Sequence, residues 1–147
     1  MELSEKAHDA ITTLCNQGDS LAKSGNTISA LEKYGQAWEA LPEPREQWEA
    51  ATWILAAIGD VQFSLGQFDH AMASFGHALR CAGAMGNPFI HLRLGQSAYE
   101  LGNMKRADDE LTRAYMGAGI DIFKAEDPKY LTRLKGVLKP PAGSNTL

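Results

Sequence analysis

The side chains that could bind a metal or a cofactor are few in this chain and are widely spaced. The four histidines are His8, His70, His77 and His91. His70 and His77 share a helical face, but they are two turns apart, which is over ~10 Å along a helix axis. Zinc sites use closely spaced histidine and cysteine ligands, and the chain has no HxxxH pair and no Cys/His cluster. The sequence therefore predicts no metal site and no cofactor.

Catalytic patterns are missing as well. No serine stands in a nucleophile motif beside a candidate base. The run Asp108-Asp109-Glu110 is typical of a solvated helix face near a helix start, which favours acids. The glycines fall at helix turns and helix crossings and form no phosphate-binding loop. We therefore predict that the protein is not an enzyme.

The chain is organised around residues 52–85, which the pattern predicts to be two helices joined by a tight turn at Gly66. Small and apolar residues follow one another here at intervals of 7, 5, 4 and 3: Gly59, Gly66, Ala71, Phe75 and Ala78. Gly59 and Ala71 are small, so two antiparallel helices can approach closely where they cross. Phe75 and Ala78 lie on one face of the second helix and fill the space beside that crossing.

The same spacing recurs on both sides of this stretch. The upstream copy is Gly18, Gly25, Ala30, Tyr34 and Ala37, and the downstream copy is Gly95, Gly102, Ala107, Leu111 and Ala114. The pattern resembles the signature of the tetratricopeptide repeat (TPR) family, whose period is about 34 residues. The resemblance implies an all-α, right-handed TPR-type solenoid of three helix-turn-helix repeats, at approximately 11–44, 52–85 and 88–121.

A seventh helix is expected to close the array over residues 128–138. Its apolar stripe consists of Tyr130, Leu131, Leu134 and Leu138. Such a stripe suits a terminal capping helix, because the last repeat must not leave its apolar side exposed. We expect residues 1–139 to form a single TPR domain and residues 140–147 to form a disordered tail.

The first two repeats are about seven residues further apart than the period of the family allows. The extra segment, Arg45 to Ala51, contains no helix breaker, so we expect one long helix over about 45–64. Such a helix projects past its neighbours and carries Trp48 with it. Trp48 either staples the extension to the preceding helix or takes part in binding.

Length and composition are ordinary for a globular protein of 147 residues, with 44% hydrophobic and 22% charged side chains. No apolar run approaches the ~20 residues of a membrane span, and the first residues lack the features of a signal peptide. Cys15 and Cys81 are better explained as buried thiols than as a disulfide. We therefore expect a cytoplasmic protein with no membrane partner, monomeric when free.

The charge is unevenly spread along the chain. Residues 1–79 hold 11 acidic and 4 basic side chains, whereas residues 80–147 hold 7 acidic and 10 basic ones. Nucleic-acid binding rests on clustered Lys and Arg, so the acidic first half argues against a nucleic-acid partner. A protein partner should present a basic contact surface to this half.

In the TPR family the first helix of each repeat lines a concave groove, and the resemblance implies four groove positions per repeat. These are Thr12, Cys15, Asp19 and Ala22, then Trp53, Ala56, Asp60 and Phe63, then Phe89, Leu92, Gln96 and Tyr99. Some of them could instead pack against neighbouring helices, but so many aromatics exceed what a non-binding surface carries. With the extension included, the candidate partner-binding residues are Asp19, Glu46, Trp48, Glu49, Trp53, Asp60, Phe63, Phe89, Gln96 and Tyr99.

One branch of the family binds the carboxy-terminal carboxylate of chaperones through Lys and Asn in this groove. The corresponding positions here are Cys15, Asp19, Ala56, Asp60, Leu92 and Gln96. Asp19 and Asp60 would repel a carboxylate, which disfavours a co-chaperone role.

The carboxy-terminal stretch MGAGIDIFKAEDPKYLTRLKGVL resembles the ends of small bacterial repeat proteins that are encoded beside polymorphic toxins. This resemblance implies an immunity protein that neutralises a cognate toxin domain. The alternatives are a general TPR adaptor and a secretion chaperone or co-chaperone. A self-assembling structural role is disfavoured by the capping helix.

Overall fold

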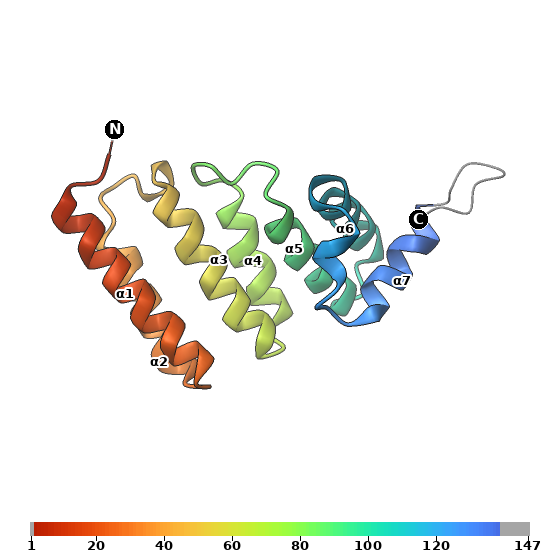
Figure 1. Cartoon of the computed structure of the whole chain (residues 1–147), viewed down its shortest axis with the longest axis horizontal. Coiled ribbons are helices and arrows are strands. Elements are labelled where there is room, and N and C mark those ends of the chain that lie inside the picture. The colour runs from red at the N-terminus through yellow and green to blue at the C-terminus, as the bar shows by residue number, and fades with distance from the viewer. Residues whose placement is uncertain (1, 139–147) are drawn as a thin grey trace. The chain divides into compact units, whose positions relative to one another are not determined.

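The computed structural model describes residues 2–138, which hold seven α-helices, two short 3-10 helices and no strand (Figure 1). The elements are α1 (Glu5–Lys23), α2 (Thr27–Ala40), η1 (Arg45–Gln47), α3 (Glu49–Ser64), α4 (Phe68–Ala78), α5 (Pro88–Glu100), α6 (Met104–Ala118), η2 (Ile120–Phe123) and α7 (Pro128–Val137). The predicted all-α fold class is confirmed. The prediction for residues 140–147 lies outside the described residues.

The chain divides into two compact units, Met1–Met85 and Gly86–Leu147. The first unit contains α1 to α4, and the second contains α5 to α7. The expectation of a single domain over residues 1–139 therefore stays a prediction.

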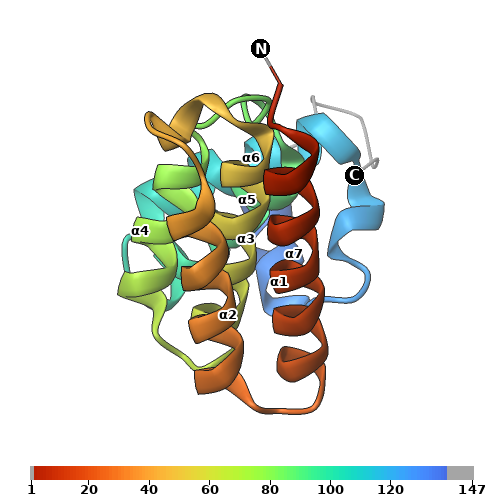
Figure 2. The same ribbon diagram turned by 90° about the vertical axis from the view of Figure 1, so that its left-hand side faces the viewer.

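In the first unit, α1 packs against α2 and α3 packs against α4, as Figure 2 shows for the first pair. The core consists of apolar side chains that the helices turn toward one another, including Ile11, Tyr34, Ile54 and Phe75. The helices α1, α2 and α4 are amphipathic and α3 is apolar over most of its length, so burial of apolar side chains against a neighbouring helix holds each pair together.

Each helix pair crosses at a glycine that faces a large side chain 16 positions later in the sequence. A Cβ atom on Gly18 would lie 2.5 Å from the ring of Tyr34, and one on Gly59 would lie 2.8 Å from the ring of Phe75. In the second unit, a Cβ on Gly95 would lie 2.7 Å from Leu111. These distances are far inside van der Waals contact. The predicted role of Gly59 at a close helix crossing is therefore confirmed.

In the second unit, the carboxy-terminal segment packs onto the α5–α6 pair. Buried side chains from α5, α6, η2 and α7 form one apolar cluster, which consists of Leu92, Leu111, Ala114, Phe123, Tyr130 and Leu134. Arg133 on α7 also donates two hydrogen bonds to Asp108 on α6, at 2.7 and 2.8 Å. The segment thus covers apolar surface of α5 and α6 with α7, as the predicted capping helix should.

The predicted continuous helix over residues 45–64 is wrong. Arg45–Gln47 forms a 3-10 turn, Trp48 is extended, and α3 begins only at Glu49. Trp48 does not project: only 7% of it is exposed, and its Nε1 donates a hydrogen bond of 2.9 Å to the carbonyl oxygen of Pro42. The backbone N–H of Ala82 donates to the carbonyl oxygen of Glu46 at 3.0 Å. These tertiary bonds favour a bent segment over a straight helix.

None of the helices in residues 2–138 combines the length and the apolar character that crossing a bilayer requires.

The crossing geometry predicts opposite effects of one substitution at two helical glycines. Gly59→Ala places a methyl group against the fully buried ring of Phe75 and should destabilise the protein by ~1–3 kcal/mol. Gly76→Ala, on α4, meets no atom within 4 Å and should stabilise by up to ~1 kcal/mol, because alanine is the better helix former. Chemical denaturation measures both. Effects of the same sign would contradict the close crossing.

The packing of the carboxy-terminal segment predicts that removing residues 126–147 uncovers the apolar cluster of the second unit. Losing Tyr130 and Leu134 should cost at least ~2 kcal/mol and promote association of the exposed surface around Leu111. Thermal melting and light scattering measure the two effects. Removing residues 139–147 alone is the control, since it leaves the cluster intact. A 126–147 truncation that melts and scatters like the control would show that α7 is no cap.

Candidate functional site

Trp53 on α3 is the most exposed tryptophan of the chain, with 58% of its surface accessible. Its indole makes no hydrogen bond or ring contact with another side chain in the part of the chain that the structure describes. The neighbouring residues Thr52 and Ile54 are buried, so α3 is anchored in the core while Trp53 is turned outward. An exposed indole on an anchored helix is a rigid, accessible contact group.

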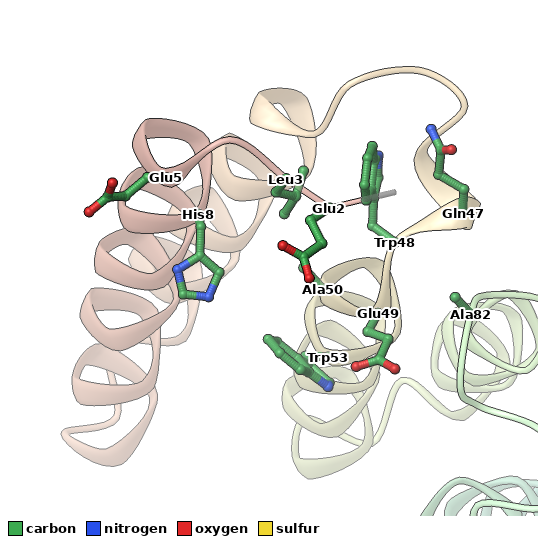
Figure 3. A pocket seen from close by; sticks show the side chains of 10 residues that line it. All are labelled: Glu2, Leu3, Glu5, His8, Gln47, Trp48, Glu49, Ala50, Trp53 and Ala82. Carbon is green, nitrogen blue, oxygen red and sulfur yellow. The ribbon is translucent and has the colours of Figure 1, made fainter.

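Trp53 lines a hollow of about 780 Å³ between the start of α1 and the start of α3 (Figure 3). We call it the α1–α3 hollow. Its lining residues are Glu2, Leu3, Glu5, His8, Gln47, Trp48, Glu49, Ala50, Trp53 and Ala82. In Figure 3 the carboxylate of Glu2 lies above the indole of Trp53 and that of Glu49 lies beside it, on the side of Ala82, whereas Glu5 points away from Trp53. Among the described residues, the lining contains three carboxylates and no Lys or Arg.

Further along the same two helices, Asp19 on α1 and Asp60 on α3 are both close enough to Tyr34 to influence its hydroxyl. The Tyr34 hydroxyl donates a 2.6 Å hydrogen bond to Asp19. Burial, this hydrogen bond and the charges of both aspartates together hold the pKa of Tyr34 above its usual range. Burial, followed by the charge of Asp19, also raises the pKa of the Cys15 thiol to about 11. This surface of α1 and α3, with the α1–α3 hollow at its amino-terminal end, is the α1–α3 face.

Three other predicted contact residues of the first unit are engaged in different ways. Trp48 is buried, and this agrees with the stapling role that the sequence left open. Glu46 is turned toward α4, where it lies 3.0 Å from Nε2 of His77, and this hydrogen bond holds the pKa of Glu46 below its usual range. Phe63 is half-buried and packs edge-on against Phe68, with ring centroids 5.4 Å apart.

The second unit corrects the prediction that Leu92 and Gln96 line an open groove. Their exposed fractions are 1% and 0%. The segment between η2 and α7 lies over this face of α5, and Glu126 accepts hydrogen bonds there from Gln96 Nε2 at 2.7 Å and from Arg93 Nη1 at 2.5 Å. Phe123 joins Leu92 in the apolar cluster. The chain's own carboxy-terminal segment therefore fills the surface that was expected to receive a partner.

The two predicted aromatic contacts of α5 are also engaged within the second unit. Arg93 lies 4.9 Å over the ring of Phe89. Tyr99 packs edge-on against Tyr130, with centroids 5.3 Å apart, and Lys129 lies 5.6 Å from the Tyr99 ring. Both rings are half-buried. Of the predicted residues in the first unit, Asp19, Glu49 and Trp53 are thus exposed, and Asp60 is half-buried.

No protein-family model matches the chain, and no curated protein is significantly similar to it in sequence. Solved structures do resemble it. The first TPR domain of Spaghetti (RPAP3), bound to the HSP90 peptide SRMEEVD, has a TM-score of 0.67 at 15% identity and covers 88% of this chain and 90% of that one. The TPR domain of Arabidopsis OM64 has a TM-score of 0.67 at 15% identity, with coverages of 90% and 97%. The second TPR domain of human RPAP3, in complex with the HSP70 peptide SGPTIEEVD, has a TM-score of 0.66 at 15% identity, with coverages of 91% and 99%.

The chain has the TPR fold. The predicted fold class is thereby confirmed, and the three glycine crossings are the cores of three TPR helix pairs. At 15% identity the likeness extends to the fold alone. The contact surface of this chain must therefore be judged from its own side chains.

Sequence reasoning missed the contribution of the first residues to this surface. Glu2, Glu5 and His8 line the α1–α3 hollow. The sequence shows that Ser4 can cap α1, and its Oγ does accept a hydrogen bond from the N–H of Ala7 at 3.1 Å. What the sequence does not reveal is that this helix start lies beside the start of α3. No local sequence pattern reveals how two helices that begin 44 residues apart, at Glu5 and Glu49, are aligned with each other.

Within residues 2–138 there is no group of three or more His, Cys, Asp or Glu side chains placed to hold a metal ion.

The surroundings of Cys15 predict an unreactive thiol. In a Cys81→Ser background, the rate of alkylation by iodoacetamide should rise about tenfold per pH unit up to about pH 10, because the thiolate is the nucleophile and the pKa of Cys15 is about 11. An ordinary thiol, with a pKa of ~8.5, would level off earlier. Asp19→Asn should lower the pKa, since the negative charge of Asp19 raises it. A rate that levels off near pH 9 would contradict this environment of Cys15.

Proposed function

We propose that this TPR protein is a non-catalytic protein-binding module whose contact surface is the α1–α3 face of the first unit. The observation that carries the proposal is the exposure of Trp53 in a hollow lined by carboxylates. Tryptophan is enriched among the residues that dominate binding energy at protein interfaces, especially where polar groups surround it. The TPR domains of RPAP3 that resemble this chain are bound to peptides, which supports the same class of function.

The charge of the face indicates what kind of partner would fit. Asp19, Asp60 and the carboxylates of the hollow lie on α1, α3 or the residues just before α1. Opposite charges across an interface increase the association rate and suppress wrong partners. The partner should therefore carry a basic surface with an apolar or aromatic centre.

The second unit contributes less accessible surface than the sequence suggests. Gln96 is buried beneath Glu126, and Phe89 and Tyr99 contact side chains of their own unit. We propose that α5, α6 and α7 mainly complete and cap the fold. Partner contacts are then expected chiefly on α1 and α3.

For the partner itself, we propose a cognate toxin domain, which would make the chain an immunity protein of a bacterial toxin–antitoxin pair. This step rests on the resemblance of residues 116–138 to the ends of small repeat proteins encoded beside polymorphic toxins. A toxin that handles nucleic acid or nucleotides presents a basic surface of the kind that the α1–α3 face would attract. A cytoplasmic location belongs to the same proposal, because an immunity protein acts where its toxin does.

The second candidate is a general adaptor or co-chaperone, as the peptides SRMEEVD and SGPTIEEVD in two of the similar structures suggest. Both peptides end in acidic residues. At this chain's α1–α3 face they would meet Asp19 and Asp60, where like charges repel. Acidic carboxy-terminal tails are therefore poor ligands for this surface, and a basic partner fits it better.

The experiment that tests the proposed function starts with the products of neighbouring genes. Co-purification with a toxin-like neighbour, and inhibition of its activity by this chain, is the expected result. Co-purification with a secretion component instead would favour the adaptor. Hydrogen exchange in the complex should protect α1 and α3. Protection confined to α2 and α4 would rule out the α1–α3 face.

Once a partner is available, Asp60→Asn should reduce its association rate severalfold at low salt and flatten the dependence of that rate on ionic strength, because one steering charge is lost. Glu32→Gln on α2 removes the same charge from an exposed position elsewhere and is the matched control. Stopped-flow or surface-based kinetics measure both. Equal effects of the two variants would show that net charge, and not the α1–α3 face, governs association.

A further inference from the structure

We infer that the α1–α3 hollow receives an arginine side chain of the protein partner, with the guanidinium stacked on Trp53 and neutralised by Glu2 and Glu49. This inference deepens the proposed function and rests on it. The hollow is the concave part of the α1–α3 face. Its volume of about 780 Å³ falls in the range of ~300–1,000 Å³ that ligand sites occupy. It can therefore take a long side chain together with the backbone on either side of it.

The indole is the first reason to expect a cation. A tryptophan face attracts a guanidinium or ammonium group placed within ~6 Å of its centroid, and tryptophan is the best of the aromatic residues at this. Trp53 is 58% exposed, and no cation of the described chain stacks on it. Elsewhere in the described chain, cations do lie over aromatic rings, for example Arg45 over Trp38, Arg93 over Phe89, and Lys129 over Tyr99 and Tyr130.

The carboxylates are the second reason. Within residues 2–138, the side chains of Glu2, Glu5 and Glu49 make no ion pair and no hydrogen bond, and no Lys or Arg lines the hollow. The acids elsewhere in the fold are mostly paired, as Asp108 is with Arg133 and Glu126 is with Arg93. The two unpaired carboxylates that lie near the accessible indole, Glu2 and Glu49, are complementary to a positive charge supplied from outside.

Helix stability alone explains only part of this arrangement. Glu5 and Glu49 lie in the first turns of α1 and α3, where the helix dipole favours a negative charge. Glu2 precedes the capping residue Ser4, and its carboxylate is turned toward the space in front of Trp53 (Figure 3). The dipole gives no reason for an exposed indole at the same place. Arginine fits better than lysine, because its planar guanidinium can stack on the ring and bind carboxylates at the same time.

A titration of the isotope-labelled full chain with N-acetylarginine amide tests the site directly. N-acetylcitrulline amide is the matched probe, since it has nearly the same shape and no charge. The expected result is a saturable shift of the Trp53 indole N–H and of the Glu49 and Ala50 amides, at least about tenfold weaker with citrulline. Trp38, which is not among the residues that line the hollow, serves as the internal reference. The inference fails if the two probes act alike, or if the Trp38 and Trp53 indoles shift equally.

Variants separate the two parts of the site. Glu2→Gln and Glu49→Gln should each weaken arginine binding about threefold to tenfold, whereas the exposed Glu32→Gln on α2 should change it less than about twofold. Trp53→Ala should abolish the shifts at Glu49 and Ala50, and Trp53→Tyr should restore part of them. The melting temperature of Trp53→Ala should change little, because more than half of the Trp53 side chain is exposed. Undiminished arginine binding by Trp53→Ala would overturn the stacking arrangement.

The purified partner complex distinguishes this inference from the proposed function. If Asp60→Asn slows association but Trp53→Ala leaves the partner's affinity unchanged, the α1–α3 face stands and the arginine inference falls. The expected result is that Trp53→Ala weakens the complex about thirtyfold or more, and that one arginine substitution in the partner has the same effect. If the chain binds the arginine amide but associates with no protein partner, the proposed function falls, and with it the partner side chain as the occupant.

Discussion

The fold depends on how closely two helices can approach where they cross. In each repeat a glycine on the first helix leaves room for a large side chain on the second helix. The three pairs are Gly18 with Tyr34, Gly59 with Phe75, and Gly95 with Leu111. The large side chain stabilises the crossing, because it fills the space that the missing Cβ of the glycine leaves and is almost fully buried there. Close packing of this kind gains dispersion contacts on both sides, and a single methylene is enough to disturb it. The outward faces of the first helices are then free to vary.

This dependence explains why most of the fold could be predicted from the sequence. A close crossing restricts which residue types can stand at fixed spacings, so the amino-acid sequence shows a pattern that repeats once in each helix pair. The bent segment before α3 produces no such sequence pattern. Residues 45–51 look helical, but the carbonyl oxygen of Pro42 accepts a hydrogen bond from Trp48, and the N–H of Ala82 bonds to Glu46. Tertiary contacts override local propensity here, and one of them comes from more than 30 residues away.

The contact surface was only partly predictable for a similar reason. Asp60 and Gln96 occupy the same position in their repeats, yet Gln96 is fully buried while Asp60 is only half-buried. What differs is the segment that follows α6, which brings Glu126 to within hydrogen-bond distance of Gln96 and Arg93. A buried carboxylate is tolerated only where donors satisfy it, and these two donors are 30 and 33 residues away in the sequence. The repeat pattern identifies which positions face outward from a helix pair, but it does not reveal what later part of the chain covers them.

Two tryptophans at the start of α3 show how a binding surface can be told from a core. Trp48 buries its ring and donates its indole N–H to a backbone carbonyl oxygen. Both the apolar and the polar part of this side chain are therefore satisfied inside the fold. Trp53, five residues later, is 58% exposed, and its indole N–H has no hydrogen-bond acceptor among the side chains of residues 2–138. Both lie against the same hollow, with the carboxylate of Glu49 between them in the sequence. Exposing an indole forgoes about 1.5–3 kcal/mol of burial, and holding unpaired like charges near one another adds repulsion. A basic partner relieves both at once: its apolar stem covers the ring and its positive charge offsets the carboxylates.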